Sequence, residues 1–165
     1  MSLNTTPISD TSILEALNDR MLTFRAQGAS EHTIQHCRLV VGRLFYHRFL
    51  RPRHILLLRD ITPQLVTEWL ALRRQQVGHR TVDSNFRVLR AFLSWCVKHG
   101  YVDDNPCEQV DPPLRLPVFK PDAREEDLMK VLDACPNYKN GIRDRALILF
   151  LLDSGVRVHE ALKLK

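Results

Sequence analysis

The 165-residue sequence has no long apolar run, and its start does not resemble a secretion signal. No stretch of about 18 apolar residues is present, so we expect no membrane-spanning helix. The opening MSLNTTPISD lacks the basic and apolar regions of a signal peptide, and we interpret residues 1–9 as a disordered arm. No internal repeat or low-complexity tract occurs. Hydrophobic content of 44% is enough for a packed core.

The four cysteines show no CxxC spacing and no regular interval. Cys37 and Cys96 fall on apolar faces of expected helices, which favours buried, reduced thiols over a disulfide framework or a zinc site. The seven histidines form no HxxH or HExxH pattern, so we expect no metal and no cofactor. This cysteine usage is typical of a protein of the reducing cytoplasm.

Positive charge is concentrated in the first part of the chain. Residues 1–102 contain 14 basic and 7 acidic residues, whereas residues 103–165 contain 10 basic and 12 acidic residues. Lys98 is the only lysine before residue 103; the other basic residues there are arginines. Because the arginine fork suits phosphate oxygens, this asymmetry points toward nucleic acid. A solvated basic face explains the charge alone equally well.

Every periodic segment of the sequence predicts a helix, so the expected fold class is all-α. Ser12 with Glu15 forms a potential capping box for the first helix, and Gly28 is a natural C-terminal residue. Ser30 begins a second helix that runs to about Phe49. The pair Thr62–Pro63 is a strong start signal for a third, with Leu72 on its apolar face. A fourth, from about residue 80 to Gly100, completes an expected compact bundle of four helices.

Residues 103–122 break the helical pattern, because they contain five of the nine prolines. We therefore expect a helical domain over residues 10–107, a proline-rich linker over 108–122 and the beginning of a second domain over 123–165. The second domain contains the apolar stretch ALILFLL within a helix from about Ile142 to Asp153. A helix that is apolar on most sides needs more covering protein than the remaining residues supply.

The fourth helix carries the strongest nucleic-acid signal in the sequence. Arg80, Arg87 and Arg90 are spaced by about two and three turns, which places them near one face, opposite the apolar positions. Arginines of the second helix form a possible second wall of a basic cleft. The candidate DNA-binding residues are Arg38, Arg43, His79, Arg80, Thr81, Arg87, Arg90 and Lys98. An ordinary amphipathic helix with a basic exterior is the alternative.

Arg157 follows the helix-ending Ser154–Gly155 pair and opens another helix, with Glu160 three residues later. At that spacing Glu160 can orient the guanidinium, and an arginine at a helix start can bind an anion. Placed against a phosphodiester, it could stabilise developing negative charge. From the residues alone, a surface ion pair worth a few tenths of a kcal/mol explains the pattern as well.

Three stretches make the chain resemble the tyrosine recombinases, the phage integrase and Xer-type family. They are SEHTIQHCRLVVGRLFYHRF with Thr33, RTVDSNFRVLRAFLSWCVKHGYVDDNP, and RDRALILFLLDSGVRVHEALKLK. The third is similar to the family segment that contains the first catalytic arginine. The resemblance implies that the four-helix bundle is a core-binding (SAM-like) domain and that residues 123–165 begin a truncated catalytic domain. It also implies that Arg157 is this arginine and that Glu160 supports it.

The family joins DNA strands through a 3′-phosphotyrosine intermediate, and its proteins assemble as tetramers on DNA. Its lysine, second arginine and nucleophilic tyrosine follow the position matched by Arg157, so the resemblance implies that these 165 residues bind double-stranded DNA as a monomer without cleaving it. A stand-alone helical DNA-binding regulator and a helical protein-interaction module are the alternatives.

Overall fold

The computed structural model describes residues 10–114 and 124–163. Over these residues the chain is helical, with one isolated bridge between Ser12 and Leu57 and no strand, which confirms the all-α prediction. The chain divides into two compact units, residues 1–117 and residues 118–165. None of the described helices combines the length and the apolar character that crossing a membrane requires.

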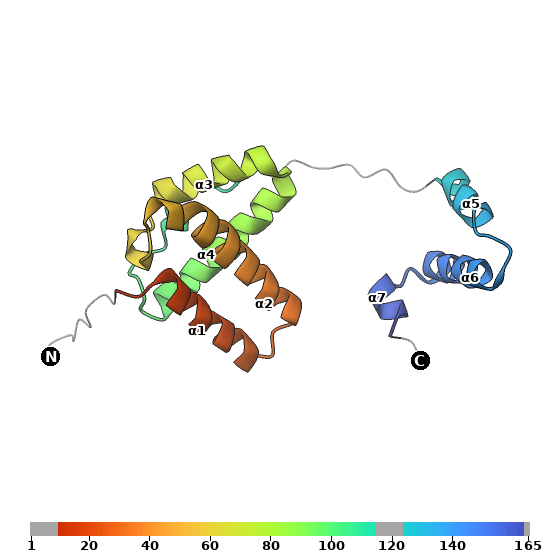
Figure 1. Ribbon diagram of the computed structural model, residues 1–165, viewed down its shortest axis with the longest axis horizontal. Coiled ribbons are helices and arrows are strands. Elements are labelled where there is room, and N and C mark those ends of the chain that lie inside the picture. The colour runs from red at the N-terminus through yellow and green to blue at the C-terminus, as the bar shows by residue number, and fades with distance from the viewer. Residues whose placement is uncertain (1–9, 115–123, 164–165) are drawn as a thin grey trace. The chain divides into compact units, whose positions relative to one another are not determined.

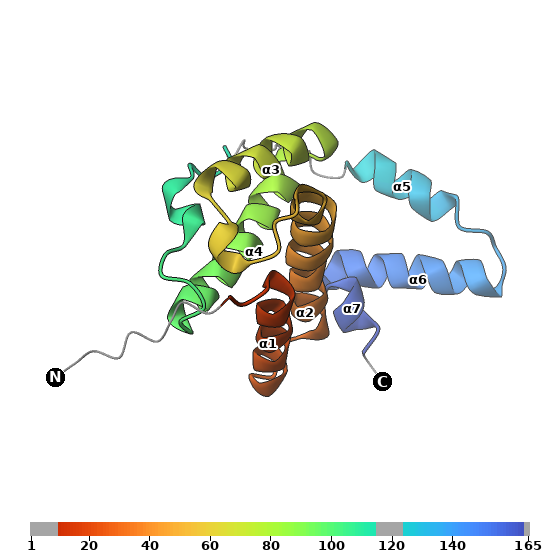
Figure 2. The same ribbon diagram turned by 60° about the vertical axis from the view of Figure 1, so that its left-hand side comes forward.

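Four long helical segments build the first unit, as the sequence predicts (Figures 1 and 2). Three short 3₁₀ helices join or extend them. The elements are α1 (Ile13–Ala26), α2 (Glu31–Cys37), its π-helical continuation η1 (Arg38–Leu50), η2 (Arg51–Arg53), η3 (Leu58–Asp60), α3 (Pro63–Gln76), α4 (His79–Lys98) and η4 (Pro106–Gln109).

The predicted helix starts are confirmed by their caps. The Ser12 hydroxyl accepts a hydrogen bond from the Glu15 backbone N–H at 3.2 Å, and the Glu15 carboxylate accepts one from the Ser12 N–H at 2.9 Å. The Ser30 and Thr62 hydroxyls cap α2 and α3 by accepting hydrogen bonds from the backbone N–H groups of Thr33 and Leu65, without a reciprocal carboxylate bond. Gly28 follows α1 with a φ of 69°, a left-handed conformation that glycine adopts without steric cost.

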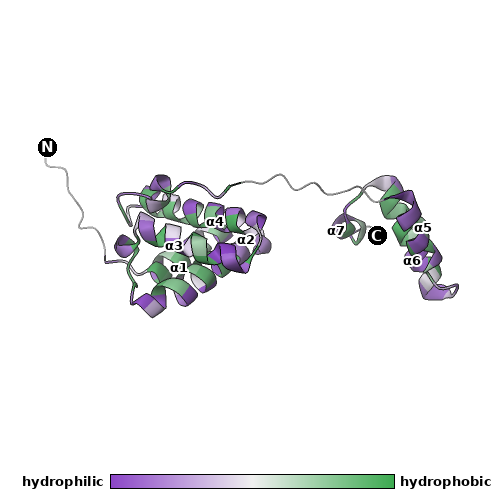
Figure 3. Cartoon of the chain, turned by 90° about the horizontal axis from the view of Figure 1, so that it is seen from above, coloured by the Kyte–Doolittle hydropathy of each residue, from purple (hydrophilic) through white to green (hydrophobic). Residues whose placement is uncertain are grey.

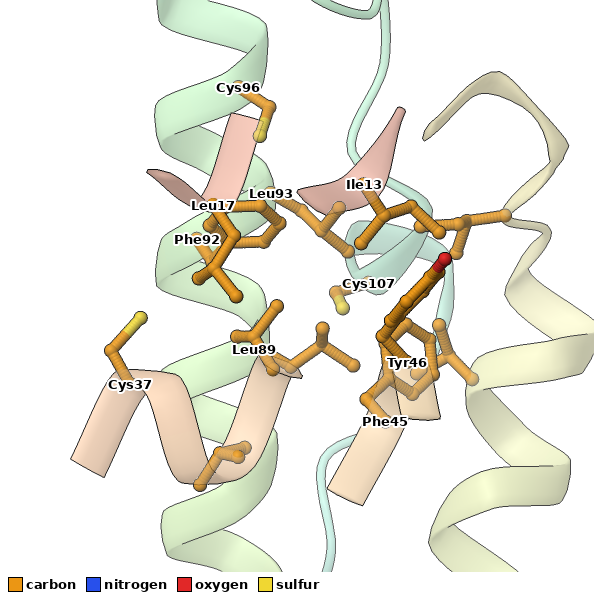
Figure 4. Packing of buried hydrophobic residues seen from close by; sticks show 14 of the residues in the cluster. Ile13, Leu17, Cys37, Phe45, Tyr46, Leu89, Phe92, Leu93, Cys96 and Cys107 are labelled. Atoms are coloured by element: carbon orange, nitrogen blue, oxygen red, sulfur yellow. The ribbon is translucent and has the colours of Figure 1, made fainter. Parts of the chain in front are cut away.

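The core of the first unit gathers apolar side chains from every long helix (Figure 4). Trp69 of α3 packs edge-on against Phe45 of η1, with ring centroids 5.0 Å apart. Leu89 and Cys96 bring the inner face of α4 to this core. Figure 3 shows hydrophobic and hydrophilic segments alternating along these helices, as expected for amphipathic helices around one core.

One predicted apolar position of α3 is wrong. Leu72 is 38% exposed, and the adjacent Arg73 is 8% exposed. The buried stripe of α3 runs through Val66, Trp69 and Leu70, and Arg73 continues it one turn later. Arg73 therefore does not belong to the outward basic surface.

The beginning of the proline-rich segment packs against the first unit. Asn105 starts η4, where Cys107 is buried, and the Asn105 amide bonds to α4. Glu108 forms an ion pair with α4, and Val110 packs against the core. Residues 108–110, which the sequence places in the linker, thus contact the helical bundle. Residues 115–122 of the expected linker and the arm 1–9 lie outside the described residues.

The second unit contains α5 (Glu125–Asp133), α6 (Lys139–Ser154) and the short α7 (Val158–Ala161). Only glycine fits at position 141, because a Cβ there would collide with the carbonyl of Pro136. The ALILFLL stretch of α6 is not a buried helix in this unit: Leu149, Phe150 and Leu152 are between 42% and 47% exposed. The second unit alone does not cover the apolar face of this helix.

Candidate nucleic-acid interface

The exposed side of α4 carries a line of basic side chains. Arg80 and Lys98 are 18 residues apart, which is five turns of an α-helix, so they lie on the same side of α4. Arg87 lies between them, about two turns after Arg80. All three side chains are exposed, whereas Phe86 and Leu89 on the inner side are buried. We call Arg80, Arg87 and Lys98 the basic stripe of α4.

The members of the basic stripe differ in their partners. Arg87 forms an ion pair with Asp83, one turn earlier, at 2.9 Å. Neither Arg80 nor Lys98 has an ion-pair partner within the portions of the chain that the structure describes. These two cations can therefore meet an external phosphate without breaking an internal ion pair.

Arg90 differs from the basic stripe in its partner. It lies about 60° around α4 from Arg87, at 100° per residue, and its side chain contacts η4. There its guanidinium makes two hydrogen bonds to the Glu108 carboxylate. Arg90 thus lies near the face predicted for Arg80 and Arg87, but a carboxylate 18 residues later in the sequence binds its guanidinium.

A cavity of about 390 Å³ lies beside the basic stripe, lined by α1, α2 and α4. Its polar lining consists of Arg20, His32, Thr33, His36, Ser84 and Arg87. The Arg20 guanidinium lies 4.0 Å from the ring centroid of Phe24, in a cation–π contact. Partial burial lowers the pKa of Arg20 from its ordinary value. The cavity therefore joins arginines, imidazoles and hydroxyls from three helices, all suited to an anionic ligand.

The remaining predicted residues occupy more scattered positions. Arg38 and Arg43 are exposed on η1, but neither lines this cavity. Thr81 is exposed in the first turn of α4, while His79 is half-buried and its Nδ1 has no hydrogen-bond partner within the described residues. Gly78, rather than a hydroxyl residue, caps α4.

Sequence reasoning missed Arg20 and His32 as members of the cavity. Arg20 lies on α1, which shows no basic pattern, and only the packing of α1 beside α4 brings it to Arg87. His32 precedes Thr33, the residue singled out by the family resemblance, and the His32 and His36 rings lie 6.1 Å apart. The HxxxH spacing of His32 and His36 could have predicted that both imidazoles lie on the same side of α2.

In the second unit, Arg157 and Glu160 contact each other as the spacing predicts. The Arg157 backbone N–H donates to Glu160 Oε2 at 3.0 Å, and Arg157 Nη1 donates to Oε1 at 3.3 Å. Arg157 caps α7 rather than lying within it. Both side chains are exposed to solvent, at 77% and 43%, so the guanidinium is oriented by Glu160 and still accessible.

We compared the chain with protein-family models, curated proteins and solved structures. No family model matches it. The tyrosine recombinase XerD of Xanthomonas axonopodis pv. citri (strain 306) is 29% identical over 159 residues, which cover 94% of this chain. The matched region spans 50% of the length of that relative.

Two solved structures share the fold. One is the N-terminal domain of a phage integrase/site-specific recombinase from Haloarcula marismortui, at 21% identity and a TM-score of 0.57, covering 64% of this chain and 99% of that domain. The other is the integrase of mycobacterium phage Brujita, at 24% identity and a TM-score of 0.54, covering 87% of this chain and 46% of the integrase. The sequence relatives are tyrosine recombinases, and the two solved structures share the fold of this chain, which together support the predicted resemblance to the tyrosine recombinase family.

Proposed function

We propose that this chain binds double-stranded DNA through its first unit, within a site-specific recombinase. The observation that supports this most directly is the basic stripe of α4, in which Arg80 and Lys98 are exposed and without internal ion pairs among the described residues. Five helical turns separate these two cations, so they can follow a phosphate backbone rather than one small anion. Thr33 and Ser84 in the neighbouring cavity supply hydroxyl donors beside Arg87.

The two alternatives differ from this proposal in a measurable way. A stand-alone DNA-binding regulator would use the same stripe, but it would have no use for Arg157 in the second unit. A protein-interaction module would show no strong dependence on salt. Binding to phosphates releases counterions, so the logarithm of the DNA association constant falls linearly with the logarithm of salt concentration.

The proposal is tested by titrating the chain with a labelled DNA duplex at several salt concentrations. Arg80→Ala should weaken binding and reduce the magnitude of the log–log slope by about 0.9, the loss of one phosphate contact. Arg59→Ala is the matched control, because it removes one exposed positive charge of the same unit, where Arg59 pairs with Asp10. Equal effects of the two substitutions, or no binding of the unsubstituted chain at low salt, would refute the proposed interface.

We further propose that residues 10–114 form the DNA-binding domain and that residues 124–163 begin the catalytic domain, with Arg157 as a phosphate-binding arginine. A guanidinium can donate two hydrogen bonds to the non-bridging oxygens of a phosphodiester and stabilise negative charge that develops there. Glu160 would hold Arg157 in place through its two hydrogen bonds. In the intact recombinase, Arg157→Lys should keep DNA affinity and lose most strand cleavage, because lysine lacks the fork. Full cleavage by that variant would reject this role.

A further inference from the structure

A second recess of the first unit lies between η1 and α3. Its volume is about 360 Å³, and Arg48 lines it from η1 while Trp69, Arg73 and Gln76 line it from α3. Leu44, Phe49 and Leu72 form its apolar walls. None of these seven residues lines the cavity beside the basic stripe of α4. The η1–α3 recess is therefore a separate feature of the bundle.

Arg73 is a buried cation without a counter-charge in this recess. Arg73 is 8% exposed, and its Nη1 donates a hydrogen bond to Gln76 Oε1 at 2.7 Å. Its Nε has no hydrogen-bond partner, and no carboxylate of the described residues pairs with the guanidinium. Burial of a charged group costs free energy unless it is paired, so a single bond to a neutral amide leaves this side chain poorly compensated.

The other polar groups of the recess include no negatively charged acceptor. The Trp69 indole Nε1 is buried and has no acceptor among the described residues. Arg48 adds a second guanidinium, on an exposed side chain. Gln76 Oε1 is the acceptor already used by Arg73. The recess thus combines two arginines with no carboxylate, so its uncompensated positive charge favours an external acceptor with negative charge.

The position of Arg73 favours a carboxylate over a DNA phosphate. A guanidinium can donate to both oxygens of a carboxylate, and Gln76 engages only Nη1 of Arg73. A side chain that is 8% exposed can be reached by a group on a slender stem. The phosphates of a DNA duplex are part of its bulky backbone and cannot enter the recess in this way. The apolar walls suit the aliphatic part of a glutamate and its apolar neighbours.

We propose that the η1–α3 recess is a docking site for a glutamate or aspartate side chain of a partner protein, bound by Arg73 and Arg48. This site is distinct from the proposed DNA interface, since it uses other residues and selects another anion. It gives the first unit a means of contacting an acidic protein segment while α4 contacts DNA.

The test uses the whole chain and a capped tripeptide, acetyl-Leu-Glu-Leu-amide, with acetyl-Leu-Gln-Leu-amide as the matched neutral probe. Binding is followed by the NMR signals of the Trp69 indole N–H and the Arg73 Nε–H, which report on the recess itself. The glutamate peptide should shift both signals saturably and bind about tenfold or more tightly than the glutamine peptide, because only it offers a charged acceptor. Sodium phosphate and a short DNA duplex are titrated in parallel.

Two variants separate recognition from folding. Arg73→Lys keeps a cation and removes the fork, and should abolish the preference for the glutamate peptide. Arg48→Gln changes an exposed side chain, so the fold should survive while glutamate-peptide affinity falls several-fold. Arg74→Gln, the exposed neighbour on α3 that does not line the recess, should leave affinity unchanged. Equal shifts with both peptides, shifts with phosphate or DNA but not with the glutamate peptide, or equal loss in Arg48→Gln and Arg74→Gln would each overturn the proposal.

Discussion

Arg90 of α4 and Glu108 of η4 form an ion pair with two hydrogen bonds, from Arg90 Nε to Glu108 Oε1 at 3.0 Å and from Nη2 to Oε2 at 2.7 Å. The hydrogen bond from Arg90 holds the pKa of Glu108 below its ordinary value, and the same bond raises the pKa of Arg90. The pair therefore stays charged near neutral pH. It holds the segment after α4 against the helix and keeps the Arg90 guanidinium bound to a carboxylate rather than free for an external anion.

Glu108→Gln should strengthen DNA binding. Without the carboxylate, the Arg90 guanidinium becomes available to phosphate, and the log–log salt slope should steepen by up to about 0.9. Both side chains are about half-exposed, so the folded state should lose little stability. Glu68→Gln on α3 is the control, because it removes the same exposed charge without releasing an arginine. If both variants raise affinity equally, the gain is a general charge effect and Arg90 has no part in binding.

Asn105 should be a strong contributor to the stability of the first unit. It is 8% exposed, its Nδ2 donates to Ser94 Oγ at 2.8 Å and to the Arg90 carbonyl at 3.2 Å, and its Oδ1 accepts from the Cys107 N–H at 2.9 Å. Asn105→Ala leaves these groups unpaired, at a cost of about 1–3 kcal/mol in the free energy of unfolding. Urea denaturation measures this loss.

The control for Asn105 is Asn18→Ala, which removes an exposed amide of α1. We expect it to change the free energy of unfolding by less than about 0.5 kcal/mol. A comparable change in the two variants would show that the η4 contacts do not fasten the end of the bundle.

Local patterns in the sequence predicted the helices, because caps and periodicity depend on residues a few positions apart. Ser12 with Glu15 and Thr62 with Pro63 are signals of that kind, and so is Arg157 with Glu160. The Arg90–Glu108 pair could not be predicted in this way, since it forms only where the chain turns back at Asn105. Arg73 is an intermediate case: its spacing from Val66 and Trp69 continues the buried stripe of α3, but its charge argued for the surface.

Thiol reactivity should distinguish Cys135 from the other cysteines. Desolvation by burial raises the pKa of Cys37 to about 11 and those of Cys96 and Cys107 to about 12. Because the thiolate is the reactive form, an alkylating reagent at mildly alkaline pH should modify the partly exposed Cys135 first. The other three should react only on unfolding. Peptide mass mapping after a short pulse checks this order, and rapid labelling of Cys96 in the folded protein would contradict the buried core.

Tyr101 and Asp19 should make the folded state sensitive to strongly alkaline pH. The Tyr101 hydroxyl donates to Asp19 Oδ2 at 2.8 Å, and this bond raises the pKa of Tyr101 from 10.0 to about 12. A pKa that folding raises contributes stability below the unfolded value, and that contribution is lost as pH rises from about 10 through about 12.

Tyr101→Phe removes this contribution, so the difference in unfolding free energy between the unsubstituted chain and Tyr101→Phe should be constant below about pH 10 and should shrink above it. Asp19→Asn keeps an acceptor but removes the negative charge, so the phenolate absorbance of Tyr101 should develop at lower pH than in the unsubstituted chain. Denaturant unfolding of the unsubstituted chain and of Tyr101→Phe at a series of pH values measures the first effect. Absorbance titration of the unsubstituted chain and of Asp19→Asn measures the second. A pH profile of Tyr101→Phe that parallels the unsubstituted chain across the alkaline range would show that the bond between α1 and the end of α4 does not form in solution.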